Sequence, residues 1–586
     1  MKYLRSDTEP GELIANIALM LQRNAMRFAD RPVCCIKKNG VYEGAAWSAF
    51  YERILSIAAG LKEIGFGKGD KMIVYSTNRP EMLELELAIM ASGGISVPIF
   101  AFFPKETVTL LVRHSDARFL AAEGALQLDR VDSALPLEKI LVFDPCPDSI
   151  HHELISFSSL QKTKSTQPIP LNFDASTDEI CLNMYTSGTM GVPKCVQLSH
   201  RNILSQQAGL ERIWGINTND RFLSYLPWHH SFGGIFERFS ALYNGAAIYL
   251  DSGCGKDPAE LLANWKLARP TVFFSVPKIY GALIEQLKYD PTLEAGIFHP
   301  GLRFVFTAAA ALPPAISQEF DRRGIPVMEG WGLTETSPCC TITDPNIKRE
   351  AGVVGKPIPG VEIRIAEDGE IQVKGPNVMK GYYKNDEANR NSFTADGWFC
   401  TGDLGEITPG GLKLRARKDR VFKLTNGEKV MPAEIEELIQ SKCHYLTYAL
   451  VIGGGREYTV ALLFPNKKAL DHPNYELSPD EGCFCPRSLS ELKKCLHGCL
   501  KDANCGLGNK FSRIKYAMLI DDELSIEGST LTPSMKIAPA RIMNTYKAHI
   551  ENLYGQENKL SHEVYIIRLE PDQGTVQNQK KATCMK

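Results

Sequence analysis

An alternation of amphipathic helical segments and short apolar segments constrains the fold of this chain more than any other feature of its sequence. Over residues 48–64, apolar side chains recur at helical spacing, and Gly65 ends the run. The strand-like segment KMIVYS follows, then a helix that Pro80 opens, then a second strand-like segment, ISVPIF. Helices that alternate with buried strands predict an α/β domain built on a parallel sheet.

The same alternation returns later in the chain. The segment RFVFTAA predicts a strand, PPAISQEFDRRG predicts a helix, and IPVMEGWG predicts a strand that leads into a loop. The uncharged residues 87–103 approach the length of a membrane span, but glycines and Pro98 interrupt them. We therefore expect a buried helix followed by a buried strand there, and no transmembrane segment.

The length of the chain predicts more than one domain. It has 586 residues, which exceeds what a single hydrophobic core normally covers. After about Gly411 the sequence becomes highly charged, and Pro432 opens a further helix. Two strands joined by a glycine turn and a helix over residues 539–554 then indicate a small α+β domain. We predict an N-terminal domain over residues 1–418 and a C-terminal domain over residues 419–586.

Charge and cysteine content limit the partners and the compartment. The 66 basic and 68 acidic residues nearly cancel, which argues against nucleic acid as a partner. The first segment lacks an uninterrupted apolar secretory core, so the sixteen cysteines predict reduced thiols in a cytoplasmic protein. Five of them lie between Cys483 and Cys505, with His497 among them. Their spacing differs from that of a zinc knuckle, so accidental clustering is favoured over metal binding.

The segment MYTSGTMGVPKC, residues 184–195, has the composition of a loop that holds a polyphosphate. Glycine allows a close approach of the backbone, hydroxyl groups donate hydrogen bonds, and a lysine adds a positive charge. It is not a P-loop, because two residues separate Gly188 from Gly191 and Cys195 follows Lys194. Taken alone, the segment also fits an ordinary surface loop.

Four further segments follow in order: EGWGLTETSP, GWFCTGDLG, RARKDRVFKLTNGEKVMPAEIE and LTPSMK. Together with the first, they resemble the motifs of the acyl-adenylate-forming enzymes, which include acyl-CoA synthetases, peptide-synthetase adenylation domains and beetle luciferases. The resemblance extends from about Arg27 to Tyr554. The segments NRPEMLELELAIMASGGISVPIF, GEIQVKGPNVMKGYYKN and LTNGEKVMPAEIE are most similar to long- and medium-chain fatty acyl-CoA synthetases.

This resemblance implies a fold and a nucleotide site. The expected fold is α/β, with parallel-type sheets and a smaller barrel-like β part in the N-terminal domain and a small mobile α+β C-terminal domain. Met190 and Cys195 stand where the family usually has smaller residues, so we expect one contact to a phosphate to be missing. The residues expected around the β- and γ-phosphates of ATP are Thr186, Ser187, Gly188, Thr189, Gly191 and Lys194.

The segment EGWGLTE is expected at the nucleotide and its metal ion. By resemblance, Trp331 and Gly332 contact the adenine side of the nucleotide, Thr334 contacts the α-phosphate and Glu335 binds Mg²⁺. One protein carboxylate is enough, because a cation that bridges phosphates takes its other oxygen ligands from ATP and water. Trp331 replaces the more common tyrosine, and the alternative role for this residue is that of a core aromatic.

The resemblance also assigns residues around the predicted domain boundary. Asp403 and Arg417 match the residues that hold the ribose, and a carboxylate can accept hydrogen bonds from both ribose hydroxyls. Ala416 stands where the family usually has glycine. Asp419 matches the hinge of the C-terminal domain, although it also fits one more charge on a solvated surface. Gly427 matches the loop along which the thiol of CoA passes.

Two further residues are expected at the reacting carboxylate. Lys536 resembles the adenylating lysine, whose charge offsets the repulsion between the substrate carboxylate and the α-phosphate. His230, in LPWHHSFGGIFER, matches a histidine of the acyl and carboxylate pocket, and its alternative is a structural histidine. Ala308 and Ala309 stand where glycines are usual, which would narrow this pocket.

The expected reaction has two steps. A carboxylic acid, preferably a fatty acid, attacks ATP in the presence of Mg²⁺ to give an acyl-adenylate and pyrophosphate, and CoA then takes the acyl group with release of AMP. No covalent intermediate with the enzyme is expected. Two alternatives stay open: a ligase that loads the acyl group onto a carrier protein, and a non-catalytic protein that binds acyl groups or nucleotides. The sequence leaves chain length, oligomeric state and peripheral membrane contact undetermined.

Overall fold

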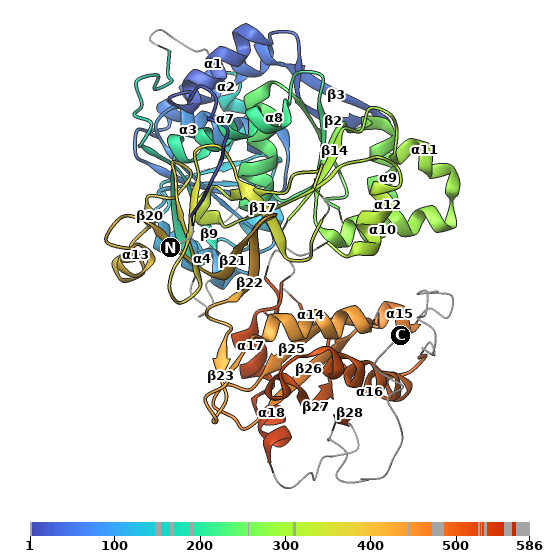
Figure 1. The fold of residues 1–586 in the computed structure, drawn as a ribbon. Coiled ribbons are helices and arrows are strands. Elements are labelled where there is room, and N and C mark those ends of the chain that lie inside the picture. Colours follow the sequence, from blue (N-terminus) through green and yellow to red (C-terminus); the bar gives the residue numbers. More distant parts are fainter. Residues whose placement is uncertain are drawn as a thin grey trace, which may run out of the picture. The chain divides into compact units, whose positions relative to one another are not determined.

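The structure is a computed structural model, and the residues it describes form two compact units (Figure 1). The first comprises described residues within Met1–Thr186, Pro193–Thr401 and Gly405–Leu414, and the second those within Gly402–Leu404 and Arg415–Lys586. The described residues are 3–146, 154–163, 169–186, 193–255, 257–308, 312–347, 349–443, 445–471, 486–525, 528, 530–532, 536–555 and 565–569.

An eight-stranded sheet contains the first alternation of helices and strands. Its strands are parallel except at one end, where two antiparallel strands are added to the last parallel one. Across the sheet the strands are β20 (Gly381–Tyr382), β10 (Lys194–Ser199), β9 (Ile180–Thr186), β5 (Ile95–Ile99), β4 (Lys71–Tyr75), β6 (Phe119–Ala122), β7 (Lys139–Val142) and β8 (Leu154–Ser156). The predicted parallel α/β arrangement is confirmed.

The helices beside this sheet begin and end close to the predicted positions. The helix expected over residues 48–64 is α2 (Trp47–Glu63). Pro80 begins α3 (Pro80–Ala91), in the first turn, where the missing N–H removes no helical hydrogen bond. The uncharged residues 87–103 include the end of α3 and β5, both of which are buried. None of the described helices is long and apolar enough to cross a membrane.

A fourteen-stranded sheet combines a parallel part with an antiparallel part. The strands of the parallel part, which end at β15, are β2 (Pro32–Lys38), β12 (Ala247–Leu250), β11 (Arg221–Ser224), β13 (Val272–Ser275), β14 (Phe304–Thr307) and β15 (Val327–Gly332). The strands that continue the sheet beyond β15 are β16 (Cys339–Ile342), β17 (Val353–Pro357), β22 (Gly411–Arg417), β21 (Phe399–Thr408), β19 (Glu370–Lys374), β18 (Glu362–Ile365) and β1 (Tyr3–Arg5). At the other edge β3 (Val41–Ala46) pairs antiparallel with β2. β15 therefore lies where the sheet changes from parallel to antiparallel.

The remaining elements of the first unit connect and cover these strands. They are α1 (Ile17–Arg27), α4 (Lys105–Ser115), α5 (Ala125–Leu128), α6 (Phe157–Leu160), α7 (His200–Trp214), the π-helix η1 (Phe232–Glu237), α8 (Arg238–Asn244), α9 (Pro258–Ala268), α10 (Pro277–Tyr289), η2 (Pro291–Leu293), α11 (Glu294–Ile297), α12 (Pro314–Asp321), η3 (Thr334–Thr336) and α13 (Asp386–Ser392). The strand and helix predicted from RFVFTAA and PPAISQEFDRRG are β14 and α12.

The second unit is a small α+β structure, as predicted. Its four-stranded sheet runs β25 (Leu446–Ile452), β26 (Thr459–Pro465), β27 (Ile514–Leu519) and β28 (Tyr565–Arg568). A two-stranded hairpin, β23 (Phe422–Lys423) with β24 (Lys429–Val430), precedes it. The helices are α14 (Pro432–Lys442), α15 (Lys467–Asp471), α16 (Leu489–Gly506), η4 (Lys510–Ser512), α17 (Pro539–Thr545) and α18 (Lys547–Tyr554).

One predicted helix is wrong in its continuity. Residues 539–554 form two helices, α17 and α18, because the backbone leaves helical geometry at Tyr546, with φ −100° and ψ 21°. The Tyr546 ring is buried among apolar neighbours, and its hydroxyl donates to Asp522 Oδ2 at 2.8 Å. Spacing alone could not predict this break, because it coincides with a tertiary contact.

Candidate active site

The carboxyl end of β15 carries the residues expected at the nucleotide. Gly332, the last residue of β15, approaches the backbone so closely that an added Cβ would lie 1.6 Å from the carbonyl oxygen of Pro338. Trp331, beside it, is 8% exposed and belongs to the main hydrophobic core. The chain then enters η3, which contains Thr334 and Glu335. A site at the carboxyl end of a strand where sheet topology changes is typical of α/β proteins.

A buried serine lies against Thr334. The hydroxyl oxygens of Ser231 and Thr334 lie 3.0 Å apart, and Ser231 is buried in the loop between β11 and η1. His230 precedes it, and Phe232 donates its backbone N–H to His230 Nδ1 at 3.3 Å. Burial, with the neighbouring His230, lowers the pKa of His229 to about 3, so the His229 imidazole is neutral near pH 7. The sequence did not single out Ser231.

Close packing fixes the loop that carries His230. A Cβ at Gly234 would lie 1.9 Å from the carbonyl oxygen of Trp228, so only glycine lets η1 pack this tightly against the loop. Trp228 donates its N–H to Asn78 Oδ1 at 2.9 Å. Arg238, which is almost fully buried, donates to the Gly234 carbonyl at 2.9 Å and pairs with Glu86 at 3.1 Å. These contacts fix the position of the loop that carries His230.

Glu335 is held through both its main chain and its side chain. Its carbonyl accepts the N–H of Met379 at 2.8 Å, and its Oε1 accepts the hydroxyl of Tyr382 at 2.8 Å. Asn377, which is buried, donates from Nδ2 to the carbonyl of Thr336 at 2.9 Å. The segment over residues 377–382 therefore fastens η3 from one side. Tyr382 lies in the GYYKN segment that the sequence identified, but no role could be assigned to it there.

The described ends of the glycine-rich segment lie on adjacent strands. Thr186 ends β9 and Lys194 begins β10, and the two residues face each other in the antiparallel register. The Lys194 ammonium lies 4.8 Å from the centre of the Tyr382 ring. Cys195 is buried, which raises the pKa of its thiol to about 12, so this thiol stays protonated. Ser187, Gly188, Thr189, Met190 and Gly191 lie outside the described residues, as does Ala309.

The second unit brings the expected ribose and adenylation residues together. Arg417 Nη1 lies 3.0 Å from Asp403 Oδ1, and Arg417 Nε lies 3.5 Å from Asp419 Oδ1. Lys536 is exposed to solvent, yet protein atoms crowd its ammonium. The resulting desolvation lowers the pKa of Lys536, while the nearby Asp403 acts in the opposite direction. A cationic group thus lies beside the predicted ribose carboxylate.

Gly427 lies in the exposed turn of the β23–β24 hairpin, at φ 83°, and a Cβ there would meet no atom within 4 Å.

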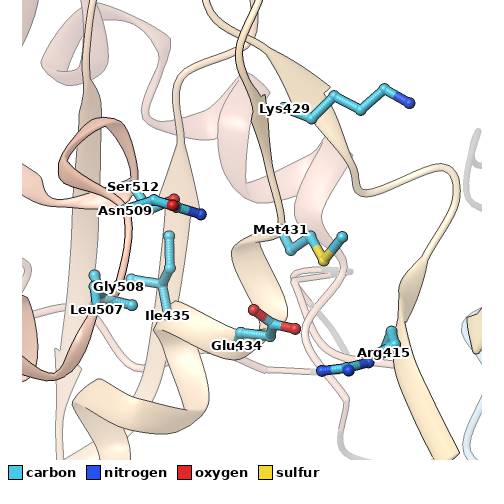
Figure 2. A pocket seen from close by; sticks show the side chains of 9 residues that line it. All are labelled: Arg415, Lys429, Met431, Glu434, Ile435, Leu507, Gly508, Asn509 and Ser512. Carbon is cyan, nitrogen blue, oxygen red and sulfur yellow. The ribbon is translucent and has the colours of Figure 1, made fainter.

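A pocket of about 400 Å³ lies in the same unit (Figure 2). Figure 2 shows the Arg415 guanidinium and the Glu434 carboxylate turned toward each other across it. The pocket is lined by Arg415, Lys429, Met431, Glu434, Ile435, Leu507, Gly508, Asn509 and Ser512.

The cysteine cluster is only partly described. Cys483 and Cys485 lie outside the described residues, whereas Cys495, Cys499 and Cys505 lie on α16. In the described part of the chain, no three His, Cys, Asp or Glu side chains form a group that could hold a metal ion.

Comparison with known protein families identifies the family of this chain. Residues 21–383 match the family described as AMP-binding enzyme, and residues 419–558 match the AMP-binding enzyme C-terminal domain. The chain belongs to the AMP-binding enzyme family. This confirms the resemblance that the five motifs indicated, although it does not test the role of any single residue.

Curated relatives are similar over most of their length. Long-chain-fatty-acid–CoA ligase FadD15 of Mycobacterium bovis is 27% identical, with 92% of this chain and 97% of the relative covered. Fatty acyl-CoA synthetase A of Dictyostelium discoideum is 25% identical, with 89% and 87% covered. Long chain acyl-CoA synthetase 6, peroxisomal, of Arabidopsis thaliana is 27% identical, with 85% and 80% covered.

Solved structures share the fold. The anthranilate CoA ligase AuaEII in complex with anthranoyl-AMP superposes with a TM-score of 0.74 at 20% identity, covering 92% of this chain and 99% of that one. ATP-bound MatB from Rhodopseudomonas palustris gives 0.73 at 22% identity, covering 92% and 100%. The predicted fold, a large α/β domain with sheets and a smaller C-terminal domain, is therefore confirmed.

Proposed function

We propose that this protein activates a fatty acid as its acyl-adenylate and then transfers the acyl group to CoA. In the first step a carboxylate oxygen attacks the α-phosphorus of ATP, the bond to the bridging oxygen breaks, and pyrophosphate leaves. In the second step the CoA thiol, having lost its proton, attacks the acyl carbon and AMP leaves. One observation carries this proposal. Lys194 and Glu335 both contact Tyr382, and Thr334, the neighbour of Glu335 in the chain, contacts Ser231.

Each group of the first unit suits part of the first step. Lys194 offers a positive charge to the terminal phosphates, which become the leaving group, together with Thr186 and the glycine-rich segment between them. Thr334 offers its hydroxyl to the α-phosphate. His230, in the adjoining loop, would line the space for the carboxylate of the acid. Trp331 and Gly332, at the end of β15, would lie along the adenine.

The donor set at Glu335 fits a magnesium ion. Its ligand atoms are carboxylate oxygens, which a hard cation prefers, and the Tyr382 hydroxyl donates to Oε1. When bound with ATP, Mg²⁺ supplies charge neutralisation on the phosphates. Glu335 would hold the ion through its second oxygen, while Tyr382 keeps the carboxylate in place.

Residues of the second unit complete the two steps. We propose that Asp403 and Arg417 bind the ribose hydroxyls. Lys536 would place its positive charge between the two reacting anions. Asp419 would act as the hinge between the N-terminal domain, residues 1–418, and a mobile C-terminal domain, residues 419–586. Gly427, which presents bare backbone at a turn, would then lie along the path of the CoA thiol.

A fatty acid is the substrate that the sequence favours. The segment WHHSFGG carries no acidic side chain to pair with an α-amino group, and a buried unpaired ammonium costs roughly several kcal/mol. Each buried methylene of an alkyl chain contributes about 0.8 kcal/mol instead. The relatives named fatty acyl-CoA synthetases support the same class. A carrier protein as the acceptor of the acyl group is the alternative, and a cytoplasmic location stays a prediction.

A panel of acids tests this function. Pyrophosphate release is measured with the full-length protein, ATP, Mg²⁺ and acetate, unbranched acids of increasing length, or free amino acids. We expect kcat/KM to rise with chain length until the acyl site is filled, and the amino acids to be inactive. Free CoA and a phosphopantetheinylated carrier protein are compared as acceptors of the acyl group. Acetate matching a ten-carbon acid, or an amino acid exceeding both, would contradict the fatty-acid assignment.

A further inference from the structure

Tyr382 occupies a position from which one side chain reaches two oppositely charged groups. It lies on β20, which pairs antiparallel with β10 so that Tyr382 faces Val196. Backbone bonds on both sides fix this register, from Tyr383 N–H to the Cys195 carbonyl at 2.8 Å and from Lys380 N–H to the Gln197 carbonyl at 3.1 Å. Tyr382 is 5% exposed, so its ring has little freedom.

The ring face of Tyr382 is turned toward a cation. Lys194 lies two residues before Val196 on β10, and alternate residues of a strand share a face, so its side chain is a diagonal neighbour of Tyr382. The Lys194 ammonium accordingly lies 4.8 Å from the ring centre, within the range of a cation–π interaction.

The hydroxyl of the same tyrosine is turned toward an anion. It donates to Glu335 Oε1 at 2.8 Å, and Met379, three residues before Tyr382, donates its N–H to the Glu335 carbonyl at 2.8 Å. The short segment from Met379 to Tyr382 thus holds both the backbone and the carboxylate of Glu335. The hydroxyl contact is made by Oε1, and within the described residues Glu335 Oε2 accepts no hydrogen bond.

Lys194 and Glu335 would attract each other if nothing separated them. A direct ion pair would turn the lysine away from the phosphates and occupy the carboxylate oxygens. Among the described residues, no ion pair joins the two side chains, and both contact Tyr382. Tyr382 instead gives each of them a separate contact, the ring face for the ammonium and the hydroxyl for the carboxylate.

We propose that Tyr382 is a positioning residue that holds the Lys194 ammonium and the Glu335 carboxylate apart and directs both toward the magnesium complex of a nucleoside triphosphate. This inference rests on the proposed function for ATP binding, and it assigns to Tyr382 no contact with the reacting atoms. The two contacts of Tyr382 can be tested separately, because the hydroxyl contacts Glu335, the proposed metal ligand, and the ring contacts Lys194.

The test uses equilibrium binding of ATP to the full-length protein without any acid, measured by calorimetry over a titration of Mg²⁺ and in EDTA. Tyr382→Phe removes only the hydroxyl. Because a hydrogen bond to a charged group is worth roughly tenfold or more, we expect the Mg²⁺ concentration for half-maximal ATP binding to rise about tenfold. ATP affinity in EDTA should stay unchanged, because the ring still contacts Lys194. Tyr382→Leu should weaken binding under both conditions.

Tyr383→Phe provides the matched control. The Tyr383 hydroxyl donates to Asp116 Oδ2 at 2.7 Å, so the same atom is removed one residue away without touching Glu335. The melting temperature of each variant is recorded, and Tyr382→Phe is combined with Glu335→Gln. If the hydroxyl acts through Glu335, the double variant should need no more Mg²⁺ than Glu335→Gln alone.

The outcomes separate this inference from the proposed function. Wild-type protein that binds Mg·ATP, with Tyr382→Phe matching Tyr383→Phe, would overturn the positioning role and leave the proposed function standing. Additive effects of Tyr382→Phe and Glu335→Gln would overturn it as well. Wild-type protein that does not bind Mg·ATP would overturn both. A tenfold shift that is confined to the Mg²⁺ titration, with no further shift when Tyr382→Phe is added to Glu335→Gln, supports the inference.

Discussion

Glu335 in the first unit and Gly427 in the second are both assigned to the reaction, but the chain around them differs sharply. Glu335 is bonded through its carbonyl and its carboxylate, and Thr334 beside it contacts a buried serine. Gly427 lies in an exposed turn where an added Cβ would meet no atom within 4 Å. Glu335, proposed to hold the metal ion of the nucleotide, is preorganised by its neighbours, whereas Gly427, proposed for the second step alone, lies where few contacts oppose movement.

We therefore expect substitutions of Lys536 and Gly427, each assigned to one step, to separate the two steps, whereas substitutions at and around Glu335 should affect the use of ATP.

Lys536→Ala should give the largest effect. Loss of a charge that acts on the developing anions lowers the rate of acyl-adenylate formation by about 10²- to 10³-fold. Transfer to CoA from supplied acyl-adenylate should continue nearly unchanged, because the lysine belongs only to the first step. The two half-reactions are measured separately, with Lys547→Ala, another exposed lysine of the second unit, as the control. Equal losses in both half-reactions would contradict the separation.

Gly427→Leu should show the reverse pattern. Its φ of 83° is unfavourable for leucine and the side chain would obstruct the thiol, so transfer to CoA should fall about ten- to thirtyfold, with adenylate formation retained. Gly455→Leu is a matched control, because Gly455 is also exposed, at φ 68°, with no atom near its Cβ position. Normal CoA-dependent turnover in Gly427→Leu, or an equal loss in Gly455→Leu, would refute the assigned path.

Glu335→Gln should raise the Mg²⁺ requirement about tenfold, because a neutral amide is a weaker ligand for a hard cation than a carboxylate. The shift should appear in every assay that uses ATP and not in transfer from supplied acyl-adenylate. Initial rates over a Mg²⁺ titration give the measurement, and Glu350→Gln, an exposed carboxylate paired with Lys413, serves as the control. An unchanged titration would place the metal ion elsewhere.

Ser231→Ala should give the smallest effect. It removes one neutral contact to Thr334, so adenylate formation should slow by about threefold, without a change in the Mg²⁺ requirement. The comparison with Glu335→Gln is informative because both residues act on η3 but through different atoms. A larger loss in Ser231→Ala than in Glu335→Gln would indicate that the serine touches substrate itself.

The sequence predicted local structure where a single segment determines it. Helix α2 follows its apolar spacing, α3 begins at Pro80, and β25 and β26 flank the predicted glycine turn. The break at Tyr546 could not be predicted, because it accompanies a contact with Asp522 rather than a helix-breaking residue. Ordered motifs were enough to recognise the family, since their residue types carry the chemistry wherever the fold places them.

The supporting contacts of the site depend on pairs that are distant in the sequence. Tyr382 reaches Glu335 across 47 positions, and Ser231 reaches Thr334 across 103. Their partners follow from the register of β20 on β10 and from the packing of η1, and neither leaves a periodic signal in one segment. The roles of the predicted residues themselves stay predictions, and the variants above address those of Lys536, Gly427 and Glu335.

The most direct test of the proposed function follows the α-phosphorus label. The full-length protein is incubated with ATP labelled at the α-phosphate, Mg²⁺ and a ten-carbon acid without CoA, and the products are separated. We predict that labelled acyl-adenylate appears with release of unlabelled pyrophosphate, and that adding CoA converts it to acyl-CoA and labelled AMP. Formation of labelled ADP, or an adenylate that CoA does not consume, would contradict the proposed two-step reaction.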